Sequence, residues 1–455
     1  MGFDNKVANS PPDIKSIQSA YDEDKVVSGT ILIPFILITS CFALWGFAND
    51  ITNPMVAAFQ KIFLTNATEA TWVQVAFYGG YGAMAIPAAL FIRRFSYKAG
   101  ILLGLALYAL GGLMFIPASN IGEFFPFLFA YFVITCGLSF LETTANPYIL
   151  SMGSEVTATR RLNLAQAFNP IGSLLGMFTA SQFILAKLDG RSKAERELLS
   201  PESFEAVKSA DLNIISQPYV IIALIIAVVF ISIALLKMPE NKPAMHADVS
   251  LSSIFKRLLT NKRYREGVIA QIFYVGAQIM CWTFIIHYGT EVFTHEGMDE
   301  KNAQILSQQY NIVAMVIFCF SRFICTFLMK FVNPGRLLML LALGGILLSA
   351  VTIFIGGRSG LYCLVAISAC MSLMFPTIYG IALQKVQGDD AKFAAAGLIM
   401  AIVGGTFLPM LQASIIDNWN ASSLTAVQVS FVLPLMCFVI IAIFGYRTNK
   451  VHDVD

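Results

Sequence analysis

Long apolar runs separated by short polar segments dominate the chain. Twelve of these runs contain about 20 or more residues, the length that a helix needs to cross roughly 30 Å of hydrocarbon. The pattern therefore predicts an all-α membrane protein with twelve transmembrane helices. The runs lie approximately at 30–54, 70–92, 98–118, 124–152, 162–187, 217–237, 267–290, 303–329, 335–355, 360–385, 394–416 and 426–446.

The composition agrees with this pattern. Hydrophobic residues make up 57% of the 455 residues and charged residues only 13%, whereas soluble domains carry roughly 25% charged residues. The net charge of +2 gives no indication of a nucleic-acid partner. All eight cysteines fall within apolar runs and none forms a CxxC pair. We interpret them as packing residues and expect no metal ion and no cofactor.

The distribution of basic residues predicts the orientation. The first 29 residues are polar, lack the apolar core of a signal peptide and are expected to form a cytoplasmic tail. With this tail inside, the connections richest in lysine and arginine also lie inside, so the positive-inside rule places both termini in the cytoplasm. These connections carry Arg93, Arg94, Lys98, Arg160, Arg161, Lys256, Arg257, Lys262, Arg263 and Arg265.

The chain divides into two similar halves. The longest polar stretch between mid-chain runs spans 237–266, and RRFSYKAGILLGLAL at 93–107 aligns without a gap with MKFVNPGRLLMLLAL at 329–343. Two pseudo-symmetric six-helix halves are typical of secondary transporters with a site near the bilayer midplane. The predicted division is a tail at 1–29, an N-terminal half at 30–237, an inter-half loop at 238–266, a C-terminal half at 267–446 and a tail at 447–455.

A carboxylate lies near the end of the first apolar run, in the stretch LWGFANDITNPM. Asp50 follows Asn49 and lies almost one helical turn before Asn53. Pro54 lacks a backbone donor, so we expect the helix to kink or break there. A charge at bilayer depth costs about 3 kcal/mol and usually faces a polar cavity. The alternative is that Asp50 lies at the helix end in headgroup water.

A second carboxylate, Glu142, lies well inside the fourth run, in CGLSFLETTANPYI. Asn146 shares its helical face, and Pro147 follows. A structural pair with a buried base is the alternative to a functional role. A carboxyl group that exchanges a proton changes both its charge and its hydrogen-bonding role, so Asp50 and Glu142 are candidates for proton coupling.

Polar stripes continue on the fifth and seventh runs. Amide groups hydrogen-bond hydroxyl groups in both directions, and an aromatic ring packs on the C–H surface of a sugar, so the stripes together indicate a sugar site. Hydrogen bonds between helices are the alternative for each residue taken singly. The stripes consist of Asn163, Gln166, Asn169 and Ser173, and of Gln271, Tyr274, Gln278 and Trp282. We predict substrate contacts from Asn49, Asn53, Asn146, Gln166, Asn169, Gln278 and Trp282.

At these residues the sequence resembles the fucose permease family of the major facilitator superfamily. The stretches SYKAGILLGLALYALGG, LETTANPY, RLNLAQAFN and FYVGAQIMCW carry the resemblance, which runs from the first apolar run to the last. It implies a monomer in the bacterial inner membrane that imports a monosaccharide, with L-fucose as the first expectation, by proton symport and alternating access. It also implies that Glu142 takes part in sugar recognition and coupling, and that Gln166 and Asn169 face the cavity.

The chain departs from the family pattern in the first run. The family's titrating carboxylate stands at the position of Asn53, whereas here the carboxylate is Asp50, about 4.5 Å earlier along the helix. The proton carrier is therefore Asp50, Glu142 or both.

Several basic residues are candidates for gating. Arg322 lies inside the eighth run and either snorkels to the cytoplasmic surface, gates the cavity or pairs with a carboxylate. The resemblance implies that Arg93, Arg94 and Lys98 form cytoplasmic loop contacts, with Lys330 as their counterpart in the other half.

Other classes fit the sequence less well. The Asn-Pro pairs at 53–54, 146–147 and 169–170 lack the alanine that follows in water channels, and the four histidines are too scattered for an enzyme site. No phosphate-binding loop indicates ATP-driven transport. A drug exporter would favour fewer amides. The strongest rival is a sodium-coupled or proton-coupled glucose or galactose carrier of the same fold, because Asn49, Asp50 and Asn53 offer oxygen ligands for a hard cation.

Overall fold

The computed structural model describes residues 26–52, 55–65, 69, 72–191, 193–238, 250–419 and 424–450. This part of the chain folds into helices and connecting turns and contains no β-strand. Eleven of its helical segments are long and apolar enough to cross a membrane. The predictions for Asn53 and Pro54 lie outside the described residues, as do 1–25, 239–249 and 451–455 of the predicted tails and loop. The predicted bounds of the two halves stay a prediction.

The helices form a first group, up to residue 238, and a second group that follows the inter-half loop. The first group comprises a 3-10 helix at Gly29–Ile31, α2 (Leu32–Thr52), α3 (Met55–Ile62), α5 (Trp72–Arg94), α6 (Tyr97–Leu113), α7 (Phe115–Ile121), α8 (Phe124–Ser151), α9 (Ala158–Gln166), α10 (Asn169–Thr179), a π-helix at Ala180–Leu185, α11 (Lys193–Glu197) and α12 (Pro201–Leu235). The second comprises α13 (Leu251–Thr260), α14 (Lys262–His295), α15 (Glu300–Leu328), α16 (Pro334–Phe354), α17 (Gly357–Met371), α18 (Met374–Ala382), α19 (Gly388–Met400), a 3-10 helix at Ala401–Val403, α20 (Gly404–Asn418), α21 (Ala426–Ser430) and α22 (Val432–Lys450).

The fifth predicted run, 162–187, is the one without a counterpart among these eleven segments. Here α9 ends at Gln166, and α10 begins at Asn169 with Pro170 in its first turn. Proline lacks an N–H group, so it suits the start of a helix and interrupts a continuous one. The π-helix at Ala180–Leu185 completes the segment. With this interrupted segment, each of the twelve predicted runs has a helical counterpart among the described residues.

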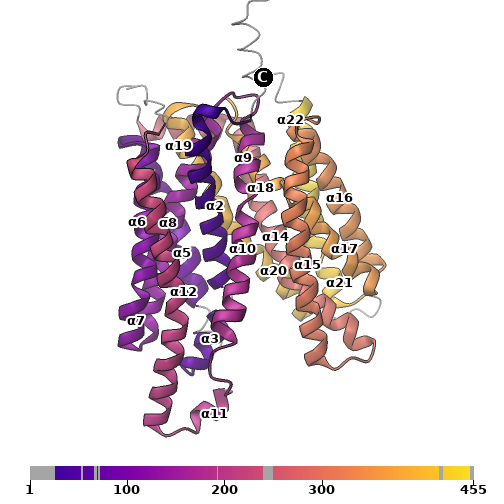
Figure 1. Ribbon diagram of the computed structural model, residues 1–455. Coiled ribbons are helices and arrows are strands. Elements are labelled where there is room, and N and C mark those ends of the chain that lie inside the picture. The colour runs from indigo at the N-terminus through magenta and orange to yellow at the C-terminus, as the bar shows by residue number, and fades with distance from the viewer. Residues whose placement is uncertain are drawn as a thin grey trace, which may run out of the picture.

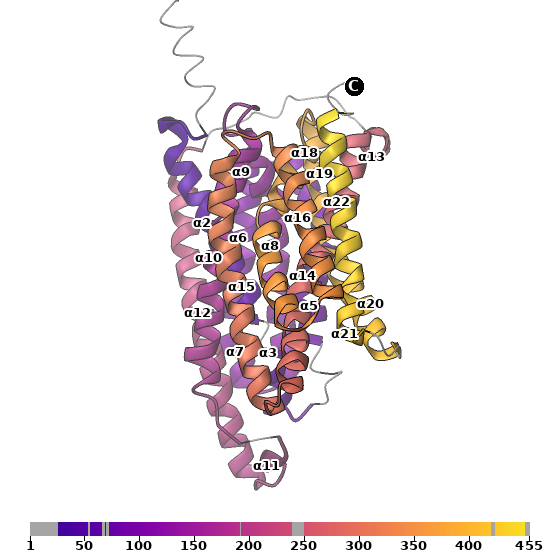
Figure 2. The ribbon, with the colours of Figure 1, turned by 90° about the vertical axis from the view of Figure 1, so that its right-hand side faces the viewer.

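The two groups of helices stand side by side (Figure 1). The ribbons come together at the upper end of the view and spread apart toward the lower end. Between the groups, α19 packs against α5 and α8, and α18 packs against α9. At the lower end, α11 and the start of α12 project beyond the other helices (Figure 2).

Two glycines set the distance between α2 and α10. A Cβ atom on Gly172 would lie 1.8 Å from the carbonyl oxygen of Ala43, and one on Gly46 would lie 2.1 Å from that of Asn169. No larger residue fits either position unless the helices separate. The close contact holds the start of α10 against the middle of α2.

Large apolar side chains cover the outer faces of the spans. Ile221, Leu224 and Val228 on α12 are examples, each more than half exposed. Such a surface is unstable in water and suits the hydrocarbon of a bilayer. The protein is therefore an integral, multi-pass membrane protein.

Candidate functional site

Glu142 lies in the interior of the first group of helices. It occupies the middle of α8 with 1% of its surface exposed, and no described basic residue forms a salt bridge with its carboxyl group. The hydroxyl groups of Tyr81 on α5 and Tyr379 on α18 lie within electrostatic range of it. An ionised carboxylate would be costly here without a partner, so the group requires either a proton or a polar ligand.

A chain of amide groups connects Glu142 with the broken fifth span. The Gln166 side chain donates from Nε2 to Oδ1 of Asn146 over 2.7 Å, and Asn146 donates from Nδ2 to the Glu142 backbone carbonyl over 2.9 Å. All three side chains are buried. The structure thus brings together three of the residues that the sequence predicts for the site.

Arg322 lies between the two groups of helices, at two helix ends. Its Nη1 donates to the Gln166 carbonyl over 2.9 Å, and its Nε donates to the Ser372 carbonyl. Gln166 ends α9, and Ser372 caps α17, so both carbonyls sit where a span is interrupted. The guanidinium supplies donors to carbonyls that lack helical partners, and its charge suits the negative ends of two helix dipoles.

Arg322 is buried away from the protein surface. The side chain is 3% exposed, and the guanidinium lies 4.5 Å from the ring centroid of Phe318. It therefore does not snorkel to the surface in this conformation.

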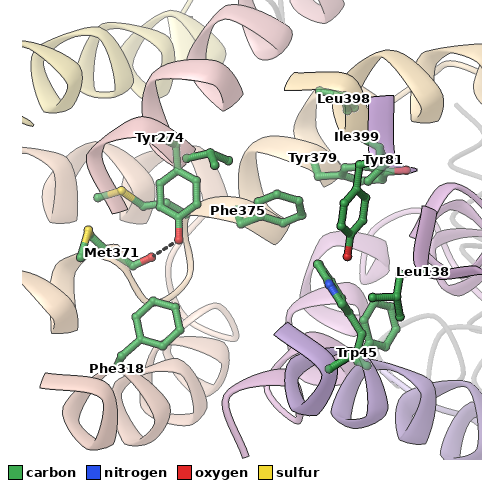
Figure 3. Close-up of a cluster of buried hydrophobic side chains, with 14 of the residues drawn as sticks. Trp45, Tyr81, Leu138, Tyr274, Phe318, Met371, Phe375, Tyr379, Leu398 and Ile399 are labelled. Carbon is green, nitrogen blue, oxygen red and sulfur yellow. Dashed lines mark hydrogen bonds between the residues drawn. The ribbon is translucent and has the colours of Figure 1, made fainter. Parts of the chain in front are cut away.

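Aromatic rings from both groups meet beside these polar residues (Figure 3). The ring centroid of Phe375 lies 6.5 Å from that of Trp45, 6.2 Å from that of Tyr274 and 6.4 Å from that of Tyr379. In Figure 3 the Tyr81 hydroxyl points toward the Trp45 indole. The rings of α2 thus face those of α14 and α18 across the boundary between the groups.

Several polar atoms around these rings have no hydrogen-bond partner among the described residues. They are Nε1 of Trp45, the hydroxyl of Tyr379 and both ends of the Gln271 amide. Tyr274, in contrast, donates to the Met371 carbonyl over 3.2 Å. Buried groups without partners are expected where a polar ligand completes the site.

The remaining predicted contact residues lie in different settings. Asn49 and Asp50 are half-buried, and α2 ends at Thr52, two residues after Asp50. Asn169 donates to the Phe42 carbonyl over 3.2 Å and so links α10 to α2. Trp282 donates to Ser368 over 3.2 Å. Gln278, also on α14, is half-buried.

The predicted gating residues separate into a cross-group contact and local contacts. Arg93 at the end of α5 pairs with Asp389 at the start of α19, with 2.8 Å between Nε and Oδ2. Lys98 instead donates to the carbonyls of Ala234 and Leu236 at the end of α12. Arg94 and Lys330 each lie over the phenylalanine that follows them in sequence.

The sequence pattern did not identify four aromatic residues of the site. Trp45 lies one turn before Asn49, and Phe375 and Tyr379 lie one turn apart on either side of Pro376. These spacings could have indicated the residues, but aromatic rings are common in apolar runs. Which distant helices bring their rings together is decided only by the tertiary structure. Tyr81 offers no such spacing.

No group of three or more His, Cys, Asp or Glu residues in the described part of the chain is arranged to hold a metal ion.

Residues 38–396 match the Major Facilitator Superfamily. The chain belongs to this superfamily.

Its relatives specify the family further. The chain is 53% identical over 432 residues to the L-fucose-proton symporter of Haemophilus influenzae, covering 94% of this chain and 99% of the relative. It is 35% identical over 429 residues to the L-fucose-proton symporter of Escherichia coli, covering 94% and 95%. A glucose/galactose transporter of Brucella abortus is 30% identical over 419 residues, covering 91% and 93%. The predicted membership of the fucose permease family is confirmed, and the chain is a transporter rather than an enzyme.

A solved structure agrees with this family. The crystal structure of the transporter FucP in the outward conformation matches with a TM-score of 0.83 and 34% identity, covering 92% of this chain and 99% of FucP. A proton:xylose symporter matches with a TM-score of 0.59 at 14% identity, and this likeness concerns the fold alone. The predicted fold of two six-helix halves is confirmed.

Proposed function

We propose that the protein imports L-fucose by proton symport. The two L-fucose-proton symporters among its relatives support this substrate and this coupling ion. The observation in the structure that carries the proposal is the buried carboxyl group of Glu142, which has the Tyr81 hydroxyl as a neighbour and lies beside a chain of amides and a set of rings from both halves.

The chemistry of these groups suits a monosaccharide. The amides of Gln166, Asn146 and Gln271 are hydrogen-bonding groups for hydroxyls, and the Trp45 and Phe375 rings offer surfaces for the C–H face of a sugar. We extend the substrate contacts to Asn49, Asn53, Asn169, Gln278 and Trp282, as the sequence predicts.

Proton coupling follows from the need of the buried Glu142 carboxyl group for either a proton or a hydrogen-bonding partner. A protonated Glu142 donates one hydrogen bond and accepts others, whereas an ionised Glu142 only accepts. Sugar binding and the loss of the proton therefore change the same contacts. Asp50, half-buried near the end of α2, is the second candidate for coupling.

Alternating access requires contacts that hold one state and are then released. We assign this role to Arg322, which binds carbonyls from both halves, and to Arg93, which pairs with Asp389 across the halves. Arg94, Lys98 and Lys330 contribute local contacts at the same end of the bundle. The likeness to FucP in its outward conformation supports an outward-facing state for this structure.

The setting is the bacterial inner membrane, with both termini in the cytoplasm and a functional monomer. The accumulation of basic residues at the proposed cytoplasmic end supports the orientation. The end at which α18 and α19 meet the first half is then cytoplasmic.

A proton-coupled or sodium-coupled glucose or galactose carrier is the second candidate. The Brucella abortus relative favours this cargo. The carboxylate of Asp50 offers the oxygen ligands that would suit sodium.

One experiment separates these possibilities. The purified protein is reconstituted into weakly buffered, sodium-free proteoliposomes, and external pH is recorded after adding L-fucose, D-galactose or D-glucose. We expect alkalinisation with L-fucose, lost in Glu142→Gln and in Asp50→Asn. Glu123→Gln, the same substitution at the exposed N-cap of α8, is the matched control and keeps the signal.

Two results would contradict the proposal. Alkalinisation with D-galactose or D-glucose in place of L-fucose would show that the protein is a glucose or galactose carrier, the second candidate. Sugar uptake that begins only when sodium is added would replace the proton as the coupling ion.

A further inference from the structure

The helix α13 precedes the second half and is amphipathic. Ile254 and Leu258 lie one turn apart and are buried against the bundle, where α13 packs on α14 and α19. Figure 2 shows α13 at the outer edge of the bundle, beside the upper ends of α19 and α22. One apolar row of α13 is therefore used for packing within the protein.

A second apolar row on α13 is largely exposed, and its only ring contact among the described residues is that of Phe255 with Phe393 of α19, with 5.8 Å between the centroids. Leu251, Phe255 and Leu259 follow each other at intervals of four residues and are 40%, 42% and 63% exposed. At that spacing they form a single stripe on the helix. Ile269 on the first turns of α14 and Tyr446 near the end of α22 are also exposed. Exposed apolar side chains thus occur on α13 as well as on the spans α14 and α22.

Basic residues border this stripe. Lys256 is exposed and pairs with no acidic group of the described residues, and Arg265 is exposed and donates only to the Leu259 carbonyl. Lys262 lies between them in sequence. A stripe of apolar side chains flanked by lysine and arginine is the pattern of a helix lying in the headgroup layer, where the cations meet anionic lipid.

On its other flank, α13 is tied to the contact that joins the two halves. Arg257 makes a bidentate pair with Asp390, at 2.8 Å from Nε and 2.6 Å from Nη2. The neighbouring Asp389 pairs with Arg93 of the first half and with Lys392. A force that fixes α13 at the membrane surface therefore also fixes the first turn of α19.

We propose that α13 is a docking surface for anionic phospholipid, with Leu251, Phe255 and Leu259 in the interface and Lys256 and Arg265 on the headgroups. Docking steadies the start of α19 and so the Asp389–Arg93 pair that joins the halves. The lipid docking itself is independent of the proposed function; only its effect on the transport rate, through the Asp389–Arg93 pair, rests on that function.

The docking is tested with a fluorescent reporter in the full-length protein. Leu259→Trp places an indole in the exposed stripe, and Thr260→Trp places one on the exposed polar side as a matched control. Each variant is reconstituted in vesicles that contain dibrominated phosphatidylglycerol or dibrominated phosphatidylcholine at the same mole fraction, and the signal of the unsubstituted protein is subtracted. We expect the added indole of the Leu259→Trp variant to be quenched, more strongly by phosphatidylglycerol, and that of the Thr260→Trp variant to be largely unquenched.

The role of the charges is tested in the same background. Adding Lys256→Ala and Arg265→Ala to Leu259→Trp should lower the preference for phosphatidylglycerol by roughly fivefold for each charge removed. Lys237→Ala with Arg336→Ala removes two exposed basic residues at the same end of the bundle and should leave the preference intact. Absence of quenching by both lipids would show that α13 lies off the membrane, and equal quenching by both would remove anionic recognition; either result overturns the proposal.

Transport provides a separate measurement. Initial sugar uptake by the native protein should be faster in vesicles containing phosphatidylglycerol than in phosphatidylcholine alone, and the Lys256→Ala/Arg265→Ala variant should lose this difference. Equal rates for the native protein would overturn the effect on α19. Failure of the proposed function would instead appear as no L-fucose uptake in either lipid, with the quenching unchanged.

Discussion

The buried polar residues of the site differ in whether other residues satisfy them. Gln166 and Asn146 bond to each other, whereas the Gln271 amide, the Trp45 indole and the Tyr379 hydroxyl have no partner among the described residues. An unsatisfied buried polar group costs about 1–3 kcal/mol, and a ligand that supplies the missing bond recovers that energy. Unpaired groups are therefore the first places to look for sugar contacts.

We predict opposite effects on binding and stability for Gln271→Leu. Removing an amide without a partner should leave the melting temperature unchanged or raise it, because no hydrogen bond within the protein is lost. Sugar affinity should fall about tenfold, the equivalent of one hydrogen bond of about 1.4 kcal/mol. Thermal unfolding and sugar-binding titration in detergent measure the two effects.

Gln412→Leu is the matched control for this prediction. Gln412 is equally buried but donates to Ser430 over 3.0 Å, so its loss should lower stability and spare sugar affinity. Unchanged sugar affinity in Gln271→Leu would assign Gln271 to packing.

Arg322 is the residue at which both interrupted spans meet. Arg322→Met keeps much of the side-chain volume but leaves the Gln166 and Ser372 carbonyls without their donor. We predict a loss of about 1–3 kcal/mol of stability for each orphaned carbonyl. Arg322→Lys should recover only part of it, since an ammonium lacks the planar fork that reaches both oxygens.

Thermal unfolding of the two Arg322 variants checks this prediction. If both variants match the native protein in stability and in uptake, the contacts between Arg322 and the two helix ends contribute nothing to the free energy of unfolding.

At the scale of elements, the interrupted helices present backbone carbonyls inside the bundle. The break between α9 and α10 and the break between α17 and α18 expose carbonyls that a continuous helix would use internally. Pro170 accounts for the start of α10, and Pro376 lies in the first turn of α18. Each break is tolerated in the membrane because another side chain supplies the missing partner.

The packing of α10 on α2 gives a prediction at this scale. Gly172→Ala places a methyl group 1.8 Å from the Ala43 carbonyl oxygen, so the helices must separate. We expect a loss of about 1–3 kcal/mol of stability, together with weaker sugar binding as Asn169 and Gln166 shift. Gly190→Ala, where no atom lies within 4 Å of the added carbon, is the control and should be neutral. Equal melting temperatures for the two variants would contradict the assigned contact.

At the scale of the whole molecule, the balance between states depends on contacts that cross the halves. These include Arg93 with Asp389, Asn163 with Thr377 over 3.1 Å, and Arg322 with Gln166. Each must be lost when the halves rock to the inward-facing state. Weak individual contacts suit this purpose, since a few kcal/mol separate the two states.

Removing the Arg93–Asp389 pair should shift that balance. Both side chains are 24% exposed, so the pair contributes on the order of 0.5–1 kcal/mol. Arg93→Ala should raise the inward-facing population about threefold, measured by distances between spin labels on the two halves. Arg93→Asp combined with Asp389→Arg should restore part of the native distribution, because the exchange re-forms this pair but removes the pair between Lys392 and Asp389. A population that stays constant in Arg93→Ala would exclude the pair from gating.

The sequence alone determined the class of protein and its fold of two six-helix halves, and it predicted several polar residues of the candidate site. Hydrophobic run length is set by the thickness of the bilayer, and a charge within a run is costly enough to signal a function, so both can be read along the chain. Tertiary structure decided which residues meet. Trp45 faces Phe375 from a distant part of the chain, and Arg322 binds two helix ends instead of reaching the surface. Such contacts depend on how separate helices pack, and no local pattern of apolar and polar residues encodes that packing.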